Sequence, residues 1–163
     1  MAATPSIGQR MLSLWGRLGT SPAGRWLYSR LVGWYIPYTG SIGCVIERLE
    51  PGHAIVRLPY RRKIRNHLNS VHAIALANLA EFSTGLAVLS GMPSGQNGIL
   101  VGIDVSYEKK ARGVITAECR TELPDYSSSN AERIEVPVET VIRDGAGEVT
   151  TRAVARWLIG PST

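Results

Sequence analysis

Six segments of the chain alternate apolar and polar residues, a pattern typical of strands that bury one face. Residues 43–50 and 53–59 flank Pro51-Gly52, which predicts an antiparallel hairpin. The other segments are residues 99–108, 113–123, 133–143 and 148–159, with turns expected at 109–112 and 144–147 and a polar loop at 124–132. Pro137 has no backbone N–H to donate, so we expect it at a sheet edge or a bulge.

A single long helical pattern lies between the second and third of these segments, at residues 70–89. Its apolar residues nearly encircle the helix, which predicts burial on most sides. The expected order is therefore ββαββββ. A helix wrapped by a largely antiparallel sheet belongs to the α+β class.

Residues 6–36 predict two short helices with a break at residues 19–22, where a capping serine precedes a proline. With arginines between their aromatic residues, these helices could lie on a bilayer or bind an acyl chain. Packing on the chain's own sheet or on a partner subunit is the simpler interpretation, and we favour it. We divide the chain into a helical extension, residues 1–38, and one α+β domain, residues 39–163.

The composition is that of one ordinary folded domain: 163 residues, of which 44% are hydrophobic and 19% charged. Cys44 and Cys119 lie far apart without metal-binding spacing, so we expect neither a disulfide nor a metal site. The sequence has no apolar run of the length of a membrane span and no compact signal peptide. A cytoplasmic location is the resulting expectation.

The net charge of +5 is concentrated near the N-terminus, because residues 1–46 contain four arginines and no acidic residue. A basic surface suits nucleic acid, a membrane or an anionic small molecule. No basic run with stacking aromatics and no helix-turn-helix spacing occurs, so we expect no nucleic-acid partner. A membrane surface stays open as a partner of residues 1–38.

Glu81 is the single charged residue between Arg65 and Asp104, in the middle of the long helical pattern. Burial without a partner would raise its pKa toward the range of a base or nucleophile. Alternatively, Glu81 lies on a solvated stripe beside Asn78 and Thr84, which stand three residues before and after it. The pattern alone favours neither interpretation.

Polar residues cluster where this helix begins: Asn66, His67, Asn69, Ser70 and His72. Ser70 or Asn69 suits the N-cap, and ordinary capping explains both. The free backbone N–H groups of the first turn also suit an oxyanion, which makes Ala73 and Ile74 candidate donors.

Nine residues separate His72 from Glu81, so helical geometry points them to opposite sides, about 13 Å apart along the axis. One chain would not easily place both in one site. Two antiparallel copies of the helix in a symmetric dimer would bring Glu81 of one chain opposite the helix start of the other.

The segment from Asn66 to Glu81 resembles the signature of hotdog-fold thioesterases of the phenylacetate-degradation type. It is most similar to an uncharacterised subgroup catalogued as a domain of unknown function. In the larger family an Asn stands six positions before a His-Gly-Gly, and an acidic residue follows the His by nine; Asn66, His72 and Glu81 match these positions. The strand order matches over about residues 40–160. The resemblance implies a hotdog fold, an antiparallel sheet wrapped around one long central helix.

The resemblance also implies roles for these residues. Glu81 would be the base or nucleophile of thioester hydrolysis, Asn66 would orient water or substrate, and His72 would position the helix start. The N–H groups of Ala73 and Ile74 would polarise the thioester carbonyl, in a site between subunits of a homodimer or homotetramer. Ala73-Ile74 replaces the family's Gly-Gly, and a branched side chain there could reshape the acyl pocket.

The function implied is an acyl-CoA or other acyl-thioester hydrolase that uses the coenzyme A thioester as substrate and needs no cofactor. Phosphates of coenzyme A would need cations. The candidates are Arg61, Arg62, Lys63 and Arg65 in one cluster and Lys109, Lys110 and Arg112 in another. Either cluster can instead be a solvated face, which is the more common role of a charge run. The alternative function is a non-catalytic acyl- or lipid-binding module, with the N-terminal helices as its lid or membrane contact.

Overall fold

The computed structural model describes residues 5–123 and 133–161. Its elements are α1 (Ile7–Leu18), α2 (Pro22–Tyr35), α3 (Pro37–Gly40), β1 (Val45–Glu50), β2 (His53–Leu58), a 3-10 turn (Arg62–Ile64), α4 (Ala73–Gly91), β3 (Gln96–Tyr107), β4 (Ile115–Arg120), β5 (Ile134–Arg143) and β6 (Val149–Pro161). The predicted ββαββββ order is confirmed, as are the two helices before it. The loop expected at 124–132 lies outside the described residues.

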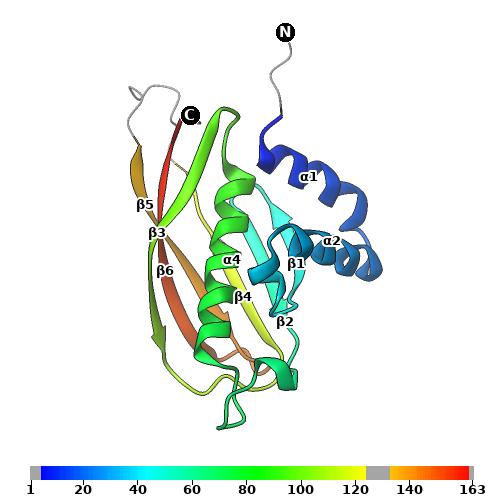
Figure 1. Cartoon of the computed structure of the whole chain (residues 1–163), viewed down its shortest axis with the longest axis vertical. Helices are drawn as coiled ribbons and strands as arrows, with labels where there is room; N and C mark the ends of the chain where they lie inside the picture. The colour runs from blue at the N-terminus through cyan, green and yellow to red at the C-terminus, as the bar shows by residue number, and fades with distance from the viewer. Residues whose placement is uncertain (1–4, 124–132, 162–163) are drawn as a thin grey trace.

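The strands form one antiparallel sheet in the order β1-β2-β4-β5-β6-β3. Figure 1 shows this sheet curving around α4, with α1 beside the helix and α2 next to β1. The predicted α+β class, a central helix wrapped by an antiparallel sheet, is confirmed. Both β1 and β3 are edge strands, and β3 is the longer of the two.

Two turn and edge predictions are also confirmed. Pro137 of β5 pairs with Arg156 of β6. Strand β4 pairs with β5 only from Thr140 onward, so it does not reach Pro137. In the described residues this stretch has a strand on one side only, as an edge position requires. The turn at residues 144–147 forms with Gly147 in the left-handed region, at a φ of 82°, and its N–H donates to the Asp144 carbonyl.

Helix α4 is the centre of the core, since 13 of its 19 residues are buried. It is long and apolar enough to cross a bilayer, yet two thirds of that apolar stretch is buried inside the fold. Its buried hydroxyls have partners: Ser83 Oγ lies 2.9 Å from Thr140 Oγ1, and Trp157 Nε1 donates to Thr84 Oγ1 at 3.3 Å. The prediction of a helix buried on most sides is confirmed.

Leu79 tests this core, because its side chain is completely buried on α4. Truncation of a buried leucine leaves a cavity, so we expect Leu79→Ala to lower the free energy of unfolding by about 3 kcal/mol. Urea denaturation measures this loss. The matched control is Leu68→Ala, at a leucine that is 48% exposed, where we expect a change within about 0.5 kcal/mol. Equal losses in both variants would contradict the burial of α4.

Helices α1 and α2 are fixed to the rest of the fold through polar contacts of α2. Arg25 forms an ion pair with Glu47 at 3.3 Å, and Ser29 Oγ accepts a hydrogen bond of 2.8 Å from the N–H of Ile46. Arg30 Nη2 donates to the carbonyl of Cys44. Helix α2 therefore packs against β1 of the chain's own sheet, and α1 packs on α2 and α4, in agreement with the simpler interpretation.

Helix α1 touches α4 very closely at Gly8. A Cβ added there would lie 1.9 Å from the carbonyl oxygen of Leu89, so glycine is required for this contact. The division of the chain at residue 38 falls inside α3 (Pro37–Gly40). That division stays a prediction.

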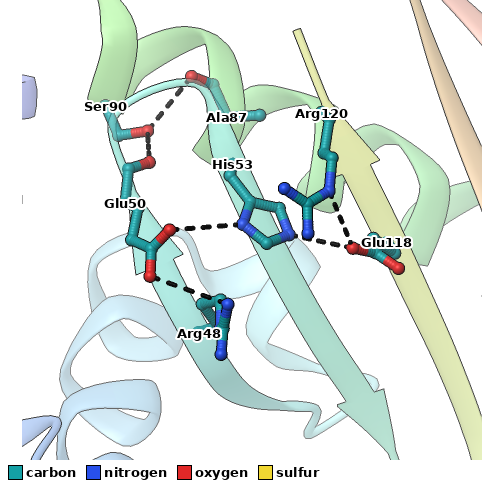
Figure 2. Close-up of polar contacts among 7 residues, drawn as sticks. All are labelled: Arg48, Glu50, His53, Ala87, Ser90, Glu118 and Arg120. Carbon is teal, nitrogen blue, oxygen red and sulfur yellow. Dashed lines mark hydrogen bonds and ion pairs between the residues drawn. The ribbon is translucent and has the colours of Figure 1, made fainter.

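A buried histidine ties the β1–β2 turn to β4 (Figure 2). His53 has one ring nitrogen 3.0 Å from Glu118 Oε1 and the other 3.5 Å from Glu50 Oε2. Burial alone would raise the pKa of Glu118, but hydrogen bonds from His53 and Arg120 outweigh it and lower that pKa. The sequence did not single out His53, because it occupies an ordinary strand position.

Candidate active site

Glu81 lies in the wall of a cavity of about 390 Å³ between α4 and the helices α1 and α2. Most of the other lining residues are apolar, among them Met11, Leu31 and Phe82. Burial raises the pKa of Glu81 above its usual value. In the described part of the chain no hydrogen bond or ion pair holds its carboxylate, so Glu81 is a desolvated group without a partner.

The interpretation of a solvated stripe around Glu81 is wrong. Asn78 is 9% exposed and Thr84 is fully buried, although both stand on the same side of α4. Thr84 donates to the backbone carbonyl of Glu81. Asn78 Oδ1 is buried and has no hydrogen-bond partner in the residues that the structure describes. Glu81, which is half-buried, therefore lines a cavity beside buried neighbours and is not part of a solvated stripe.

The N-cap of α4 is His72, and the prediction of Ser70 or Asn69 as the cap is wrong. The N–H of Val71 donates to the carbonyl of Ala111 at 2.8 Å, and Val71 also forms an antiparallel bridge with Arg65. These contacts keep the chain extended up to the cap. The helix consequently begins at Ala73, three residues later than the sequence pattern indicated.

The backbone donors at the helix start differ in their availability. His72 Nδ1 accepts a hydrogen bond of 3.2 Å from the N–H of Ile74, so this predicted oxyanion donor is occupied. The N–H of Ala73 has no acceptor among residues 5–123 and 133–161. The Ile74 side chain is 58% exposed and points away from the core.

Asn66 shapes the loop that leads into α4. Its Oδ1 accepts hydrogen bonds from the N–H of Leu68 and from both the N–H and the hydroxyl of Ser70, at 2.9 to 3.2 Å. Asn69 in the same loop adopts a φ of 51°. The side-chain oxygen of Asn66 is therefore used within its loop, which leaves its amide N–H groups for water or substrate.

A second, more polar cavity of about 200 Å³ lies at the start of α4. Its lining brings His72, Ile74 and Asn78 together with two of the predicted cations, Lys63 and Arg65. Helical angles do not apply to His72, because it is the extended cap residue, with a ψ of 138°. The angular argument therefore does not apply to this pair, but His72 and Glu81 still line separate cavities, as the sequence predicted. Ile74 and Glu81, seven residues apart, lie on nearly the same face.

Some of the other predicted cations are held by contacts within the chain, and others are exposed. Arg61 donates to the carbonyls of Ile42 and Gly43, and Lys109 pairs with Asp144 and Glu148. Arg112 Nη2 is 3.5 Å from the carbonyl of Leu68, whereas Arg62 and Lys110 are exposed. Arg65 also stacks over the Tyr60 ring, with 5.3 Å to the centroid. Of the predicted cations, Lys63 and Arg65 line the polar cavity at the start of α4.

The cap at His72 can be tested separately from any chemistry. We expect His72→Ala to lower the free energy of unfolding by about 1 kcal/mol, because the N–H of Ile74 loses its acceptor. His72→Asn supplies a side-chain oxygen and should restore most of that loss. Urea denaturation of the three proteins distinguishes these outcomes. A loss in His72→Asn as large as in His72→Ala would argue against the capping role.

Comparison with known proteins shows related chains. The profile of a domain of unknown function, DUF4442, matches residues 24–159. A candidate esterase of Halobacterium salinarum is 33% identical over 120 residues, which span 71% of this chain and 78% of that protein. A structural-genomics crystal structure is 28% identical with a TM-score of 0.79, and the match covers 96% of this chain and 100% of the other.

Two further solved structures have thioester-related descriptions. A Pseudomonas aeruginosa protein of unknown function, described as a candidate thioesterase, is 26% identical with a TM-score of 0.75, over 83% of this chain and 95% of its own. A Streptococcus mutans protein bound to acetyl-CoA is 16% identical with a TM-score of 0.60, over 74% of this chain and 92% of its own, and shows a shared fold only. These neighbours are hotdog folds, so the predicted hotdog fold is confirmed.

Proposed function

The chain belongs to the DUF4442 family of domains of unknown function, and from the site of this member we propose that it hydrolyses acyl thioesters. The observation that carries the proposal is Glu81, a lone carboxylate in an apolar cavity with a raised pKa. Such a carboxylate is a stronger base than one in water, and it can accept a proton from water or attack a carbonyl carbon. The candidate esterase and candidate thioesterase among its relatives support this reaction.

In the proposed reaction, Glu81 takes a proton from a water molecule that Asn66 orients, and the water oxygen attacks the thioester carbonyl. Backbone N–H groups at the start of α4 stabilise the oxyanion that forms. The carbon–sulfur bond then breaks, and the thiol leaves with the proton, so the products are a carboxylic acid and a thiol. No cofactor enters this balance. Acyl-CoA is the proposed substrate, in line with the acetyl-CoA bound to the structural neighbour.

The site is proposed to need two chains. Ala73 and Glu81 are eight residues apart on α4, about 12 Å along the axis, which is too far to act on one carbonyl carbon. An oxyanion donor for Glu81 would therefore come from the α4 start of a partner subunit. The edge strand β3 offers a way to pair, because Ile99 and Val101 expose apolar side chains on it. A homodimer results, and a homotetramer could form from two such dimers.

Incubation with a panel of acyl-CoAs and a thiol reagent tests the function. We expect release of coenzyme A above the rate without enzyme for at least one acyl chain. No release for any chain from acetyl to palmitoyl would contradict thioester hydrolysis. Co-purified fatty ligand without turnover would instead favour a non-catalytic acyl-binding module, a second candidate supported by the occupied N–H of Ile74.

A further inference from the structure

The larger cavity has an outer wall made by the N-terminal helices. Met11 and Leu14 line it from α1, Leu31 and Val32 from α2, and Phe82 and Leu86 from α4. Figure 1 shows α1 and α2 lying along the same side of the fold as the upper half of α4. The volume of this cavity, about 390 Å³, is within the range of small-molecule sites, roughly 300–1,000 Å³.

We infer that this cavity binds the aliphatic chain of the acyl thioester, with α1 and α2 as a fixed outer wall. The inference rests on the proposed function, since it places the acyl group beside Glu81. It assigns the substrate class as linear fatty acyl thioesters of at least medium length. It also gives the N-terminal helices a role in substrate binding.

The chemistry of the lining supports an aliphatic occupant. Glu81 is the single carboxylate among the described lining residues and stands at one end of the α4 stretch that borders the cavity, while Leu89 stands at the other. These residues are eight positions apart, about 12 Å along the helix axis. A linear chain with its reacting carbon at Glu81 would run along this stretch and exchange water for contacts with its apolar lining. Arg10 is the one cation among the described lining residues, so a polar acyl group would find few partners there.

The neighbouring polar cavity gives the substrate a direction. Asn78 lines that cavity three residues before Glu81, and its buried Oδ1 lacks a partner in the described residues. An unpaired buried acceptor is costly, so a ligand N–H that reaches it is favoured. Lys63 and Arg65 add positive charge at the same cavity. The carrier arm would lie on this side of Glu81 and the acyl chain on the other.

The wall is fixed rather than a hinged lid. Tyr28 of α2 donates to the carbonyl of Met11 in α1, and its ring packs edge-on against Trp15 with 5.1 Å between centroids. The close contact of Gly8 with Leu89 joins α1 to the end of α4. The cavity is therefore formed before any ligand binds, and its length limits the acyl chain that fits.

Leu31→Trp and Leu27→Trp form a matched pair of variants for the test. Both leucines are on α2 and are about equally exposed, at 45% and 43%, but only Leu31 lines the cavity. The probes are thioether analogues of coenzyme A with butyl or decyl chains, which cannot be hydrolysed. Calorimetric titration should show that each methylene entering the cavity tightens binding of the wild type by about fourfold. The decyl analogue should then bind at least about 100-fold more tightly than the butyl analogue.

Leu31→Trp fills the cavity and should reduce this decyl preference to below about tenfold, whereas Leu27→Trp should keep it. Leu14→Trp narrows the same cavity from α1 and serves if Leu31→Trp does not fold. Equal affinity for both analogues in the wild type, or equal behaviour of the Leu31 and Leu27 variants, would overturn the inference. Acyl-CoA hydrolysis without any dependence on chain length would overturn it while the proposed function stands. Tight decyl binding that Leu31→Trp weakens, without hydrolysis, would support the site and refute only the proposed function.

Discussion

Glu81→Gln should lower kcat for acyl-CoA hydrolysis by about 10²- to 10⁴-fold, the usual contribution of a general base or nucleophile. The amide has the size of the carboxylate but cannot accept the proton of the attacking water. Because Glu81 has no hydrogen-bond partner among the described residues, the substitution breaks no contact of the fold. Steady-state kinetics with the best acyl-CoA of the panel measures the loss.

Two variants serve as controls for this experiment. Glu81→Asp keeps a carboxylate with a shorter reach and should retain more activity than the glutamine variant. Glu122→Gln changes an exposed carboxylate outside both cavities and should leave kcat unchanged. Undiminished hydrolysis by Glu81→Gln would remove this residue from the chemistry, whatever the relatives of the chain do.

The raised pKa of Glu81 also fixes the direction of two pH effects. A base must be deprotonated, so the hydrolysis rate should fall as the pH drops through the raised pKa, and this limb should vanish in Glu81→Gln. For stability, the protonated form is favoured in the folded state. The stability that protonated Glu81 contributes is complete below the ordinary glutamate pKa of about 4.3 and is lost as the pH rises through the raised pKa of Glu81. Glu81→Gln should therefore be more stable than the wild type at neutral pH, but not at acidic pH.

The order of strands and the central helix could be predicted because their signals are local. Alternation with a period of two marks each strand, and an apolar surface all round marks α4. Glu81 stood out for a related reason, since one charge in a long uncharged segment is visible without knowledge of the fold. The motif around it located the start of α4 to within three residues.

Features that depend on distant parts of the chain could not be predicted. The cap of α4 moved to His72 because Val71 bonds to Ala111, forty residues later. The cavity beside Glu81 depends on how α1 and α2 pack, and the surroundings of Asn78 depend on α3 and the residues after it; the sequences of these segments do not specify that packing. The sequence assigned these helices correctly but gave no sign that they enclose the carboxylate.

Charges on the exposed face of β3 should abolish the dimer and, with it, most of the hydrolysis. Ile99 and Val101 are 50% and 47% exposed on an edge strand of 12 residues, a surface that natural proteins leave uncharged mainly where another chain pairs. In a symmetric dimer paired through β3, the lysines of an Ile99→Lys/Val101→Lys variant would lie close to the same lysines of the other chain, and like charges repel. Sedimentation velocity should show a dimer for the wild type and a monomer for the variant.

The loss of activity should accompany the loss of the dimer, because the 12 Å between Ala73 and Glu81 along α4 leaves Glu81 without an oxyanion donor in its own chain. Loss of one such donor typically costs about 10²- to 10³-fold in kcat. Val114→Lys places one lysine at a residue that is 43% exposed but outside β3, and should leave mass and activity unchanged. A monomeric β3 variant with full kcat would mean that one chain holds the whole site. A dimeric β3 variant would mean that β3 is not the pairing edge, and a monomeric wild type would contradict the two-chain site.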